Sequence, residues 1–136
     1  MSDDASERVA AATLIRDAHF PGRAPIDAYG NGGFRFADMS HRGSLLCLPS
    51  GIYGWRPASL DDLEPGDLDR LAGEKGLEFV LFGTGDELRP LPRGVRDLLA
   101  AHGLRGEPMS TGAAVRTLNV LLAEDRPVGA ALFAVA

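Results

Sequence analysis

Two continuous apolar runs constrain the fold of this chain more than any other feature of its sequence. Residues 77–82 contain a single polar side chain, Glu78, and residues 128–135 contain none. Both runs have the length of a β-strand, but a half-exposed strand would alternate apolar and polar side chains. A strand that is apolar throughout is buried on both faces, as in a sheet covered by helices on either side. We therefore expect a three-layer α/β sandwich.

Helical patterns alternate with these strands. The periodicity of apolar residues predicts helices over residues 65–73, 92–102 and 112–124. Proline begins the first two helices, at a position where its missing N–H costs no hydrogen bond. A short strand over residues 104–109 separates the second helix from the third. This order indicates a central mixed, mostly parallel sheet with right-handed crossovers and helices on both faces.

The segment before the first helix carries the pattern of an N-terminal β-hairpin. Residues 33–38 alternate, with two phenylalanines on one face, and residues 44–48 form an apolar run of strand length. A polar turn at residues 39–42 would connect the two strands. Residues 52–55 are expected to extend the same sheet by a few positions.

The chain of 136 residues has the usual size of a single domain. We expect that domain to comprise residues 25–136, because no linker or repeat divides them. Residues 1–24 include an alanine-rich stretch that Pro21 and Gly22 interrupt. They are expected to form a partly disordered or helical N-terminal arm.

Charge and cysteine content exclude several classes of protein. The net charge is −5 and no basic stripe is present, so we expect no nucleic-acid partner. Acidic residues concentrate in residues 61–69, which we interpret as a solvated face. The single cysteine, Cys47, allows no intrachain disulfide, and within its apolar strand it behaves as a small hydrophobic residue. No apolar run is long enough to cross a bilayer, and the acidic N-terminus lacks the pattern of a secretory signal. We therefore expect a cytoplasmic protein without direct membrane insertion.

The carboxyl ends of two predicted strands provide a candidate binding surface. One glycine-containing loop follows the first apolar run, and a serine-threonine pair caps the third helix. In open α/β sheets such loops border the ligand crevice, and a helix N-terminus favours an anion. Two polar residues three positions apart on the third helix share one of its faces. The candidate surface therefore comprises Gly83, Thr84, Gly85, Ser110, Thr111, Arg116 and Asn119.

Each of these residues also has a structural interpretation. The glycine-containing loop lacks the third glycine of a dinucleotide-binding fingerprint and fits a tight turn. Arg116 could instead form a structural bridge. Trp55 is either a buried anchor or a contact with a partner. The histidines, His19, His41 and His102, do not have metal-ligand spacing, so we expect neither a metal site nor a cofactor.

The third helix carries a pattern that resembles a known family. The segment from Met109 to Glu124 resembles the signature of the family of the mitochondrial NADH dehydrogenase (complex I) assembly factor 3, many of whose bacterial members have no assigned function. The resemblance covers residues 26–136, and its departures include Ser110, Val115 and Leu118, where bacterial members often have Asp, Cys and Tyr. Other matching residues are Tyr29, Gly30, Gly33, Phe34, Arg35, Gly43, Ser44, Trp55, Gly83, Thr84 and Gly85.

The resemblance implies a three-layer α/β fold, respiratory NADH dehydrogenase subunits or assembly factors as partners, and a shared surface without a catalytic role. Our first hypothesis is a non-catalytic protein-interaction domain similar to these assembly factors. An alternative is a protein that binds a small anionic ligand in a crevice near Thr84, Ser110 and Arg116. A weaker one is a hydrolase that uses Ser110 or Thr111, neither of which has an evident base.

Overall fold

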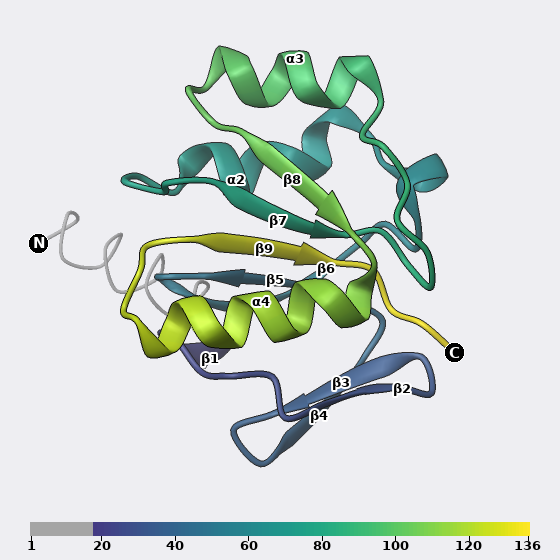
Figure 1. The fold of residues 1–136 in the computed structure, drawn as a ribbon, viewed down its shortest axis with the longest axis vertical. Helices are drawn as coiled ribbons and strands as arrows, with labels where there is room; N and C mark the ends of the chain where they lie inside the picture. The colour runs from purple at the N-terminus through teal and green to yellow at the C-terminus, as the bar shows by residue number, and fades with distance from the viewer. Residues whose placement is uncertain (1–17) are drawn as a thin grey trace, which may run out of the picture.

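The structure is a computed structural model that describes residues 18–136, shown in Figure 1. Its central sheet has the strand order β1-β6-β5-β9-β7-β8. The strands of this sheet are β1 (Ala18–Pro21), β5 (Ser44–Leu48), β6 (Gly51–Trp55), β7 (Val80–Gly83), β8 (Gly106–Met109) and β9 (Gly129–Leu132).

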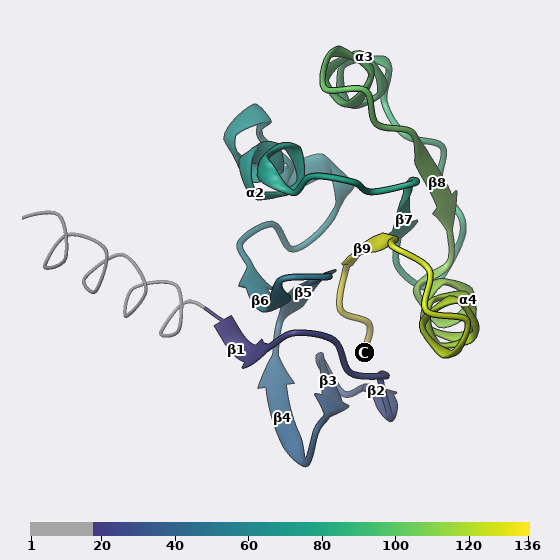
Figure 2. The same cartoon turned by 90° about the vertical axis from the view of Figure 1, so that its left-hand side faces the viewer.

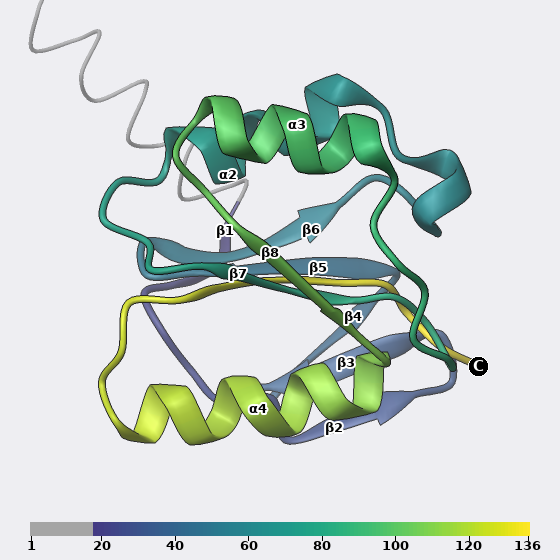
Figure 3. The same ribbon diagram turned by 45° about the horizontal axis from the view of Figure 1, so that its top comes forward.

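Helices and a second, smaller sheet cover the central sheet, so the predicted three-layer α/β architecture is confirmed. One face carries the 3₁₀ helices η1 (Leu60–Asp62) and η2 (Pro65–Leu68), α2 (Asp69–Gly73) and α3 (Arg93–Ala101). The other face carries α4 (Thr111–Ala123) and the small sheet of β2 (Ala28–Gly30), β3 (Gly33–Phe36) and β4 (Met39–Arg42). Figures 2 and 3 show α3 and α4 on opposite sides of the central sheet.

The central sheet is mixed, as predicted, but parallel pairing is confined to β9, β7 and β8. The pairings of β1 with β6, β6 with β5 and β5 with β9 are antiparallel. Two of the five pairings are parallel, so the expectation of a mostly parallel sheet holds only for the part formed by β9, β7 and β8. The reason is local, because β5 and β6 are joined by a tight turn, and such a turn can connect only antiparallel neighbours.

Two apolar cores lie on the two faces of the central sheet. One is formed by Phe34 and Phe36 of the small sheet with Leu118 of α4, and the other contains Leu71 and Leu99 from α2 and α3. Strands β7 and β9 are buried at every position, which confirms that the two apolar runs contribute to both cores. Each fully buried large aliphatic or aromatic side chain stabilises the fold by about 1.5–3 kcal/mol.

The predicted hairpin between residues 33–38 and 44–48 is wrong. Residues 39–42 form strand β4 instead of a turn, and β4 pairs with β3 inside the small sheet. The reversal occurs at Ala37 and Asp38, whose φ angles of 48° and 61° suit a tight two-residue turn. Such angles are unusual for alanine, so the sequence carried no signal for this turn. Gly43, with φ 95°, then leads the chain into the central sheet, where β5 pairs with β6 and β9.

The other predicted elements differ from the structure mainly at their ends. The helix predicted over residues 65–73 is divided into η2 and α2, and the third helix begins one residue earlier than expected. Strand β1 lies within the stretch predicted as an N-terminal arm and forms an edge of the central sheet. The rest of that arm, residues 1–17, lies outside the described residues. Among the described helices, none is long and apolar enough to cross a membrane.

Candidate functional site

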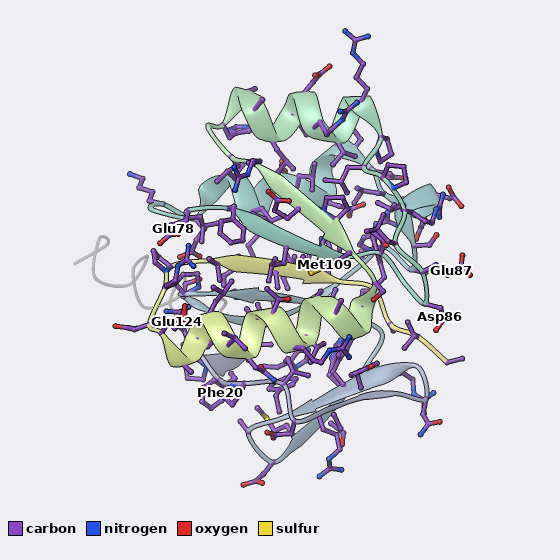
Figure 4. All side chains as sticks on the ribbon, in the orientation of Figure 1. Phe20, Glu78, Asp86, Glu87, Met109 and Glu124 are labelled. Atoms are coloured by element: carbon purple, nitrogen blue, oxygen red, sulfur yellow. The ribbon has the colours of Figure 1, made fainter. Side chains whose placement is uncertain are left out.

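The structure brings the two loops of the predicted surface together at the carboxyl ends of β7, β8 and β9. Backbone hydrogen bonds join them, with Thr84 N–H donating to Met109 O at 2.8 Å and Thr111 N–H donating to Gly85 O at 2.8 Å. Phe133 N–H donates to Gly83 O at 2.9 Å and adds the segment after β9 to this junction. Figure 4 places Met109 where β8 meets the start of α4, and Glu124 at the other end of that helix.

Thr111 is the central polar group of this strand-end junction. Its side chain is fully buried, its hydroxyl donates to Phe133 O at 2.8 Å, and the same oxygen accepts from Gly85 N–H at 3.0 Å. A hydroxyl oxygen with both a donor and an acceptor satisfied inside the protein is held in place by the fold. Thr111 therefore connects α4 to two strand ends.

The hydroxyl groups of Thr84 and Ser110 have similar structural partners. The buried Thr84 hydroxyl contacts Glu87 O at 2.7 Å and Met109 O at 3.1 Å, and it accepts from Arg89 N–H at 2.9 Å. Ser110 is the N-cap of α4, and its side chain accepts from Ala113 N–H at 3.2 Å. These hydroxyls organise the loop and the helix N-terminus, so the hydroxyl groups that the sequence assigned to a crevice form hydrogen bonds within the protein.

Gly83 and Asn119 of the predicted surface also support the fold. A Cβ atom on Gly83 would lie 3.0 Å from Thr111 Cα, a tight contact that would push α4 and the strand end apart by a few tenths of an ångström. Asn119 faces the loop before β2, where its Oδ1 accepts from Ile26 N–H and its Nδ2 donates to Ile26 O, both at 2.9 Å. This double hydrogen bond attaches α4 to that loop.

Arg116 is the member of the predicted surface that remains exposed to solvent. It lies one helical turn after Gly112, and the Tyr29 hydroxyl of β2 fills the space that a side chain at Gly112 would need. The Arg116 guanidinium lies 3.5 Å from the same point, so Tyr29 and Arg116 are neighbours at the start of α4. Sequence reasoning did not select Tyr29 as a surface residue, although it belongs to the segment that resembles the family.

The side of α4 that faces away from the central sheet forms a continuous surface, which we call the α4 outer face. Val120 on this face is 58% exposed, and Tyr29, which borders the start of the face at Gly112, is 42% exposed. Arg116 is the one charged residue among the residues of α4 itself. The α4 outer face consists of Gly112, Ala113, Arg116, Thr117, Val120, Ala123 and the C-cap residue Glu124.

Trp55 lies in the core on the α3 side of the central sheet and is distant from this surface. It is 8% exposed, its ring stacks on Phe133 with 5.0 Å between centroids, and its Nε1–H donates to Asp67 O at 2.9 Å. A buried indole with its N–H satisfied anchors the core. The structure thus places Trp55 where it contributes packing.

The acidic segment is partly neutralised by arginines. Arg56 donates to both Asp62 and Asp67, and Arg89 donates to Asp61 at 2.9 Å. The hydrogen bond from Arg56 lowers the pKa of Asp67, and a backbone hydrogen bond from Ala58 followed by Arg56 lowers the pKa of Asp62. These carboxylates therefore hold the loop between β6 and α2 together.

Two histidines that are far apart in the sequence meet in the structure. The rings of His19 in β1 and His41 in β4 have centroids 4.5 Å apart, and His41 Nε2 lies 2.9 Å from Ser44 O. Burial lowers the pKa of His41, as does the nearby His19, against the opposing effect of the hydrogen bond with the Ser44 carbonyl. Within residues 18–136 no group of three or more metal-binding side chains is found.

The thiol of Cys47 is buried in β5, as the sequence indicated. Burial raises its pKa to about 12, so the reactive thiolate is disfavoured at neutral pH.

Residues 26–133 match the profile of a family described as "Protein of unknown function (DUF498/DUF598)". The chain is 44% identical to an uncharacterised protein of Rhodobacter capsulatus over 117 residues, which are 86% of this chain and 90% of that protein. It is 31% identical over 108 residues to the human NADH dehydrogenase [ubiquinone] 1 alpha subcomplex assembly factor 3, over 79% of this chain. The chain spans 59% of the length of that human relative.

The fold also resembles a known crystal structure. A Bartonella henselae protein, described as an outer membrane protein, is 59% identical and superposes with a TM-score of 0.80 over 87% of this chain and 100% of that protein.

Proposed function

Because the chain belongs to the DUF498/DUF598 family of proteins of unknown function, and is related to the assembly factor 3 of NADH dehydrogenase, we propose that it is a non-catalytic domain that assists the assembly of a respiratory NADH dehydrogenase. The observation that carries this proposal is the 31% identity to the human assembly factor over 79% of the chain. In this role the protein contacts subunits or other assembly factors from the cytoplasmic side of the membrane.

The hydroxyl groups considered for ligand binding or catalysis support the non-catalytic part of the proposal. Thr84, Ser110 and Thr111 each form hydrogen bonds that hold the strand-end junction together. A nucleophile requires a hydroxyl oxygen that can reach a substrate and a base that accepts its proton. The Thr111 oxygen instead has a backbone donor and a backbone acceptor, at 3.0 and 2.8 Å.

The α4 outer face is the surface that we assign to the partner. A helix at a protein surface normally carries a polar stripe toward water, whereas α4 exposes Val120 and has a single charged residue, Arg116. Centres of protein interfaces are depleted in charge and enriched in tyrosine and arginine, and energetic hot spots favour the same two residues. Tyr29 and Arg116 lie together at the start of α4, and Val120 continues the surface one turn further.

The experiment that tests this proposal is affinity capture of the tagged full-length chain from detergent-solubilised cells of its own source, followed by mass spectrometry. The proposal expects enrichment of NADH dehydrogenase subunits or assembly intermediates over a tag-only control. A reproducible capture in which those subunits are no more abundant than in the control would contradict it.

A further inference from the structure

A second surface, the outer face of the small sheet, has a charge opposite to that of the chain as a whole. In the register of this sheet, Phe34 is paired with Tyr29 and His41, and Phe36 with Met39. Both phenylalanines are at most 3% exposed and belong to the same core as α4. Successive side chains of a strand point to opposite faces, so the intervening positions point away from that core. These positions are Ala28, Gly30, Gly33, Arg35, Ser40 and Arg42.

The outer face is hollowed into a groove of about 450 Å³, which we call the small-sheet groove. Gly30 and Gly33 are opposite each other in β2 and β3, so the floor of the groove is formed by backbone at these positions. Arg42 is paired with Gly33, and Arg35 with Ser40, and all three polar residues line the groove. The groove therefore combines a flat backbone floor with two guanidinium groups.

Among the described residues, no carboxylate is paired with the two guanidinium groups of this groove, and the nearest part of the C-terminal residue, Ala136 O, lies 4.0 Å from the Cβ position of Gly30. No carboxylate is present among its six outward positions, and Arg35 donates to a neutral group, Ser40 Oγ, at 3.2 Å. Within the part of the chain that the structure describes, neither Arg35 nor Arg42 forms an ion pair. By contrast Arg56 and Arg126 each pair with a carboxylate at 2.6 Å. In a chain with a net charge of −5, a pair of uncompensated arginines attracts an anion that most of the surface would repel.

We propose that the small-sheet groove binds an acidic segment of a partner protein in an extended conformation. Arg35 and Arg42 are diagonal neighbours on adjacent strands, an arrangement in which side chains start about 7–8 Å apart. Carboxylates two positions apart on an extended segment point to the same side and are separated by about 6.6 Å. An extended segment with Asp or Glu at alternate positions thus presents two carboxylates at the spacing of the two guanidiniums, each able to form a bidentate pair.

The geometry favours such a segment over a single small anion. A phosphate or carboxylate ion between Arg35 and Arg42 would have to draw two separated side chains together and would leave the glycine floor uncovered. An extended backbone covers that floor, in which Gly33 serves the sheet itself, because a Cβ there would collide with His41 O of β4. The preference for an extended segment therefore rests on the separation of the two guanidinium groups.

Purified full-length protein and a short synthetic peptide in which Glu alternates with Thr test this proposal by fluorescence anisotropy. Replacing both arginines, as Arg35→Gln with Arg42→Gln, is expected to weaken binding by about tenfold or more, since two charge-assisted contacts are lost. The matched control is Arg93→Gln with Arg96→Gln on α3, which changes the net charge equally at the opposite side of the molecule and is expected to leave affinity within about twofold. Circular dichroism and thermal melting verify that both double variants remain folded.

Any of three results would overturn the proposal outright, and a fourth would reassign the groove. The three are an equal loss of affinity in the α3 control, equal binding of a peptide in which Gln replaces Glu, and no measurable binding of the Glu peptide to the folded wild type. Displacement of the peptide by inorganic phosphate at equal concentration would also overturn it and assign the groove to small anions. The assay uses no respiratory complex, so its failure would leave the assembly-factor proposal untouched.

Discussion

Helices α3 and α4 cover opposite faces of one sheet. They differ in the charge of their exposed sides and in the contacts that attach them to the rest of the fold. The outward side of α3 carries Arg93, Arg96 and Asp97, while its inward side contributes Leu99 to a core by apolar contact. On α4 the outward side is almost uncharged.

Polar side chains join α4 to the rest of the fold. Thr111 bonds it to two strand ends, and Asn119 bonds it to the loop before β2. Helix α3 is therefore held by apolar contacts and has a charged exposed side, whereas α4 is held by polar contacts and carries the surface that we propose for a partner. A rigid element is the better platform for such a surface because little conformational freedom is lost on binding.

The largest effect is expected at the N-terminus of α4. Thr111→Val keeps the shape of the side chain but leaves the Gly85 N–H and the Phe133 carbonyl without their partner, at a fully buried position. We expect a loss of about 2–4 kcal/mol in the free energy of unfolding, measured by urea denaturation. The matched control, Thr117→Val on the same helix, should change stability by less than about 0.5 kcal/mol. Equal effects of the two substitutions would show that the hydrogen bonds of Thr111 do not fix this helix.

A smaller effect is expected at the second polar attachment of α4. Asn119→Ala removes both hydrogen bonds to Ile26 and should lower the free energy of unfolding by about 1–2 kcal/mol. The exposed neighbour Arg116→Ala should lie within about 0.5 kcal/mol of the wild type in the same chemical denaturation. If the Asn119 variant is as stable as the Arg116 variant, the loop before β2 does not depend on this contact.

The two helices offer a matched pair of glycines at their second positions. Nothing lies near a Cβ added to Gly94 of α3, so Gly94→Ala should raise stability by about 0.5 kcal/mol through helix propensity. In α4 a Cβ on Gly112 meets the Tyr29 hydroxyl, so Gly112→Ala should gain less or lose stability as Tyr29 moves. Melting temperatures of the two variants, recorded side by side, would refute this contrast if they rise equally.

The smallest change is expected in pH dependence, on the α4 side of the sheet. Because the pKa of His41 is lowered in the folded state, the unfolded chain binds more protons than the folded chain as the pH falls below about 6.5. This contribution to stability is fully present above that pH and is lost as the pH falls through the lowered value. His41→Gln should flatten the decline in denaturation midpoint between neutral and mildly acidic pH. If the denaturation midpoint of the variant falls with pH as steeply as that of the wild type, groups other than His41 cause the decline.

Local sequence patterns predicted where the helices and strands lie better than they predicted which strands pair with each other. Residues 112–124 were expected to be helical and α4 spans Thr111–Ala123, because the spacing of apolar residues reports a helix directly. The hairpin prediction was wrong because the turn at Ala37 and Asp38 has positive φ angles, which an alanine-aspartate pair does not indicate. Which strands pair is decided by contacts between distant segments, which periodicity within one segment does not contain.

The position of the candidate surface was also predicted better than the hydrogen bonds within it. The sequence placed the loops at Thr84 and Ser110 beside each other, because both follow strands that end at one edge of the sheet. It did not reveal that the Thr111 hydroxyl would be used by Gly85 and Phe133, or the Thr84 hydroxyl by Met109, since those partners come from other segments. The contact of His19 with His41 was missed for the same reason.

The most direct test of the central claim is quantitative affinity capture with one apolar-to-lysine substitution on each helix. Val120→Lys alters the α4 outer face, and Ala100→Lys makes a similar change at an exposed position of α3. If α4 carries the partner surface, Val120→Lys should reduce recovery of NADH dehydrogenase subunits at least about tenfold, the effect of losing a central apolar contact, while Ala100→Lys retains it. Equal recovery by both folded variants, or a loss confined to Ala100→Lys, would contradict the account.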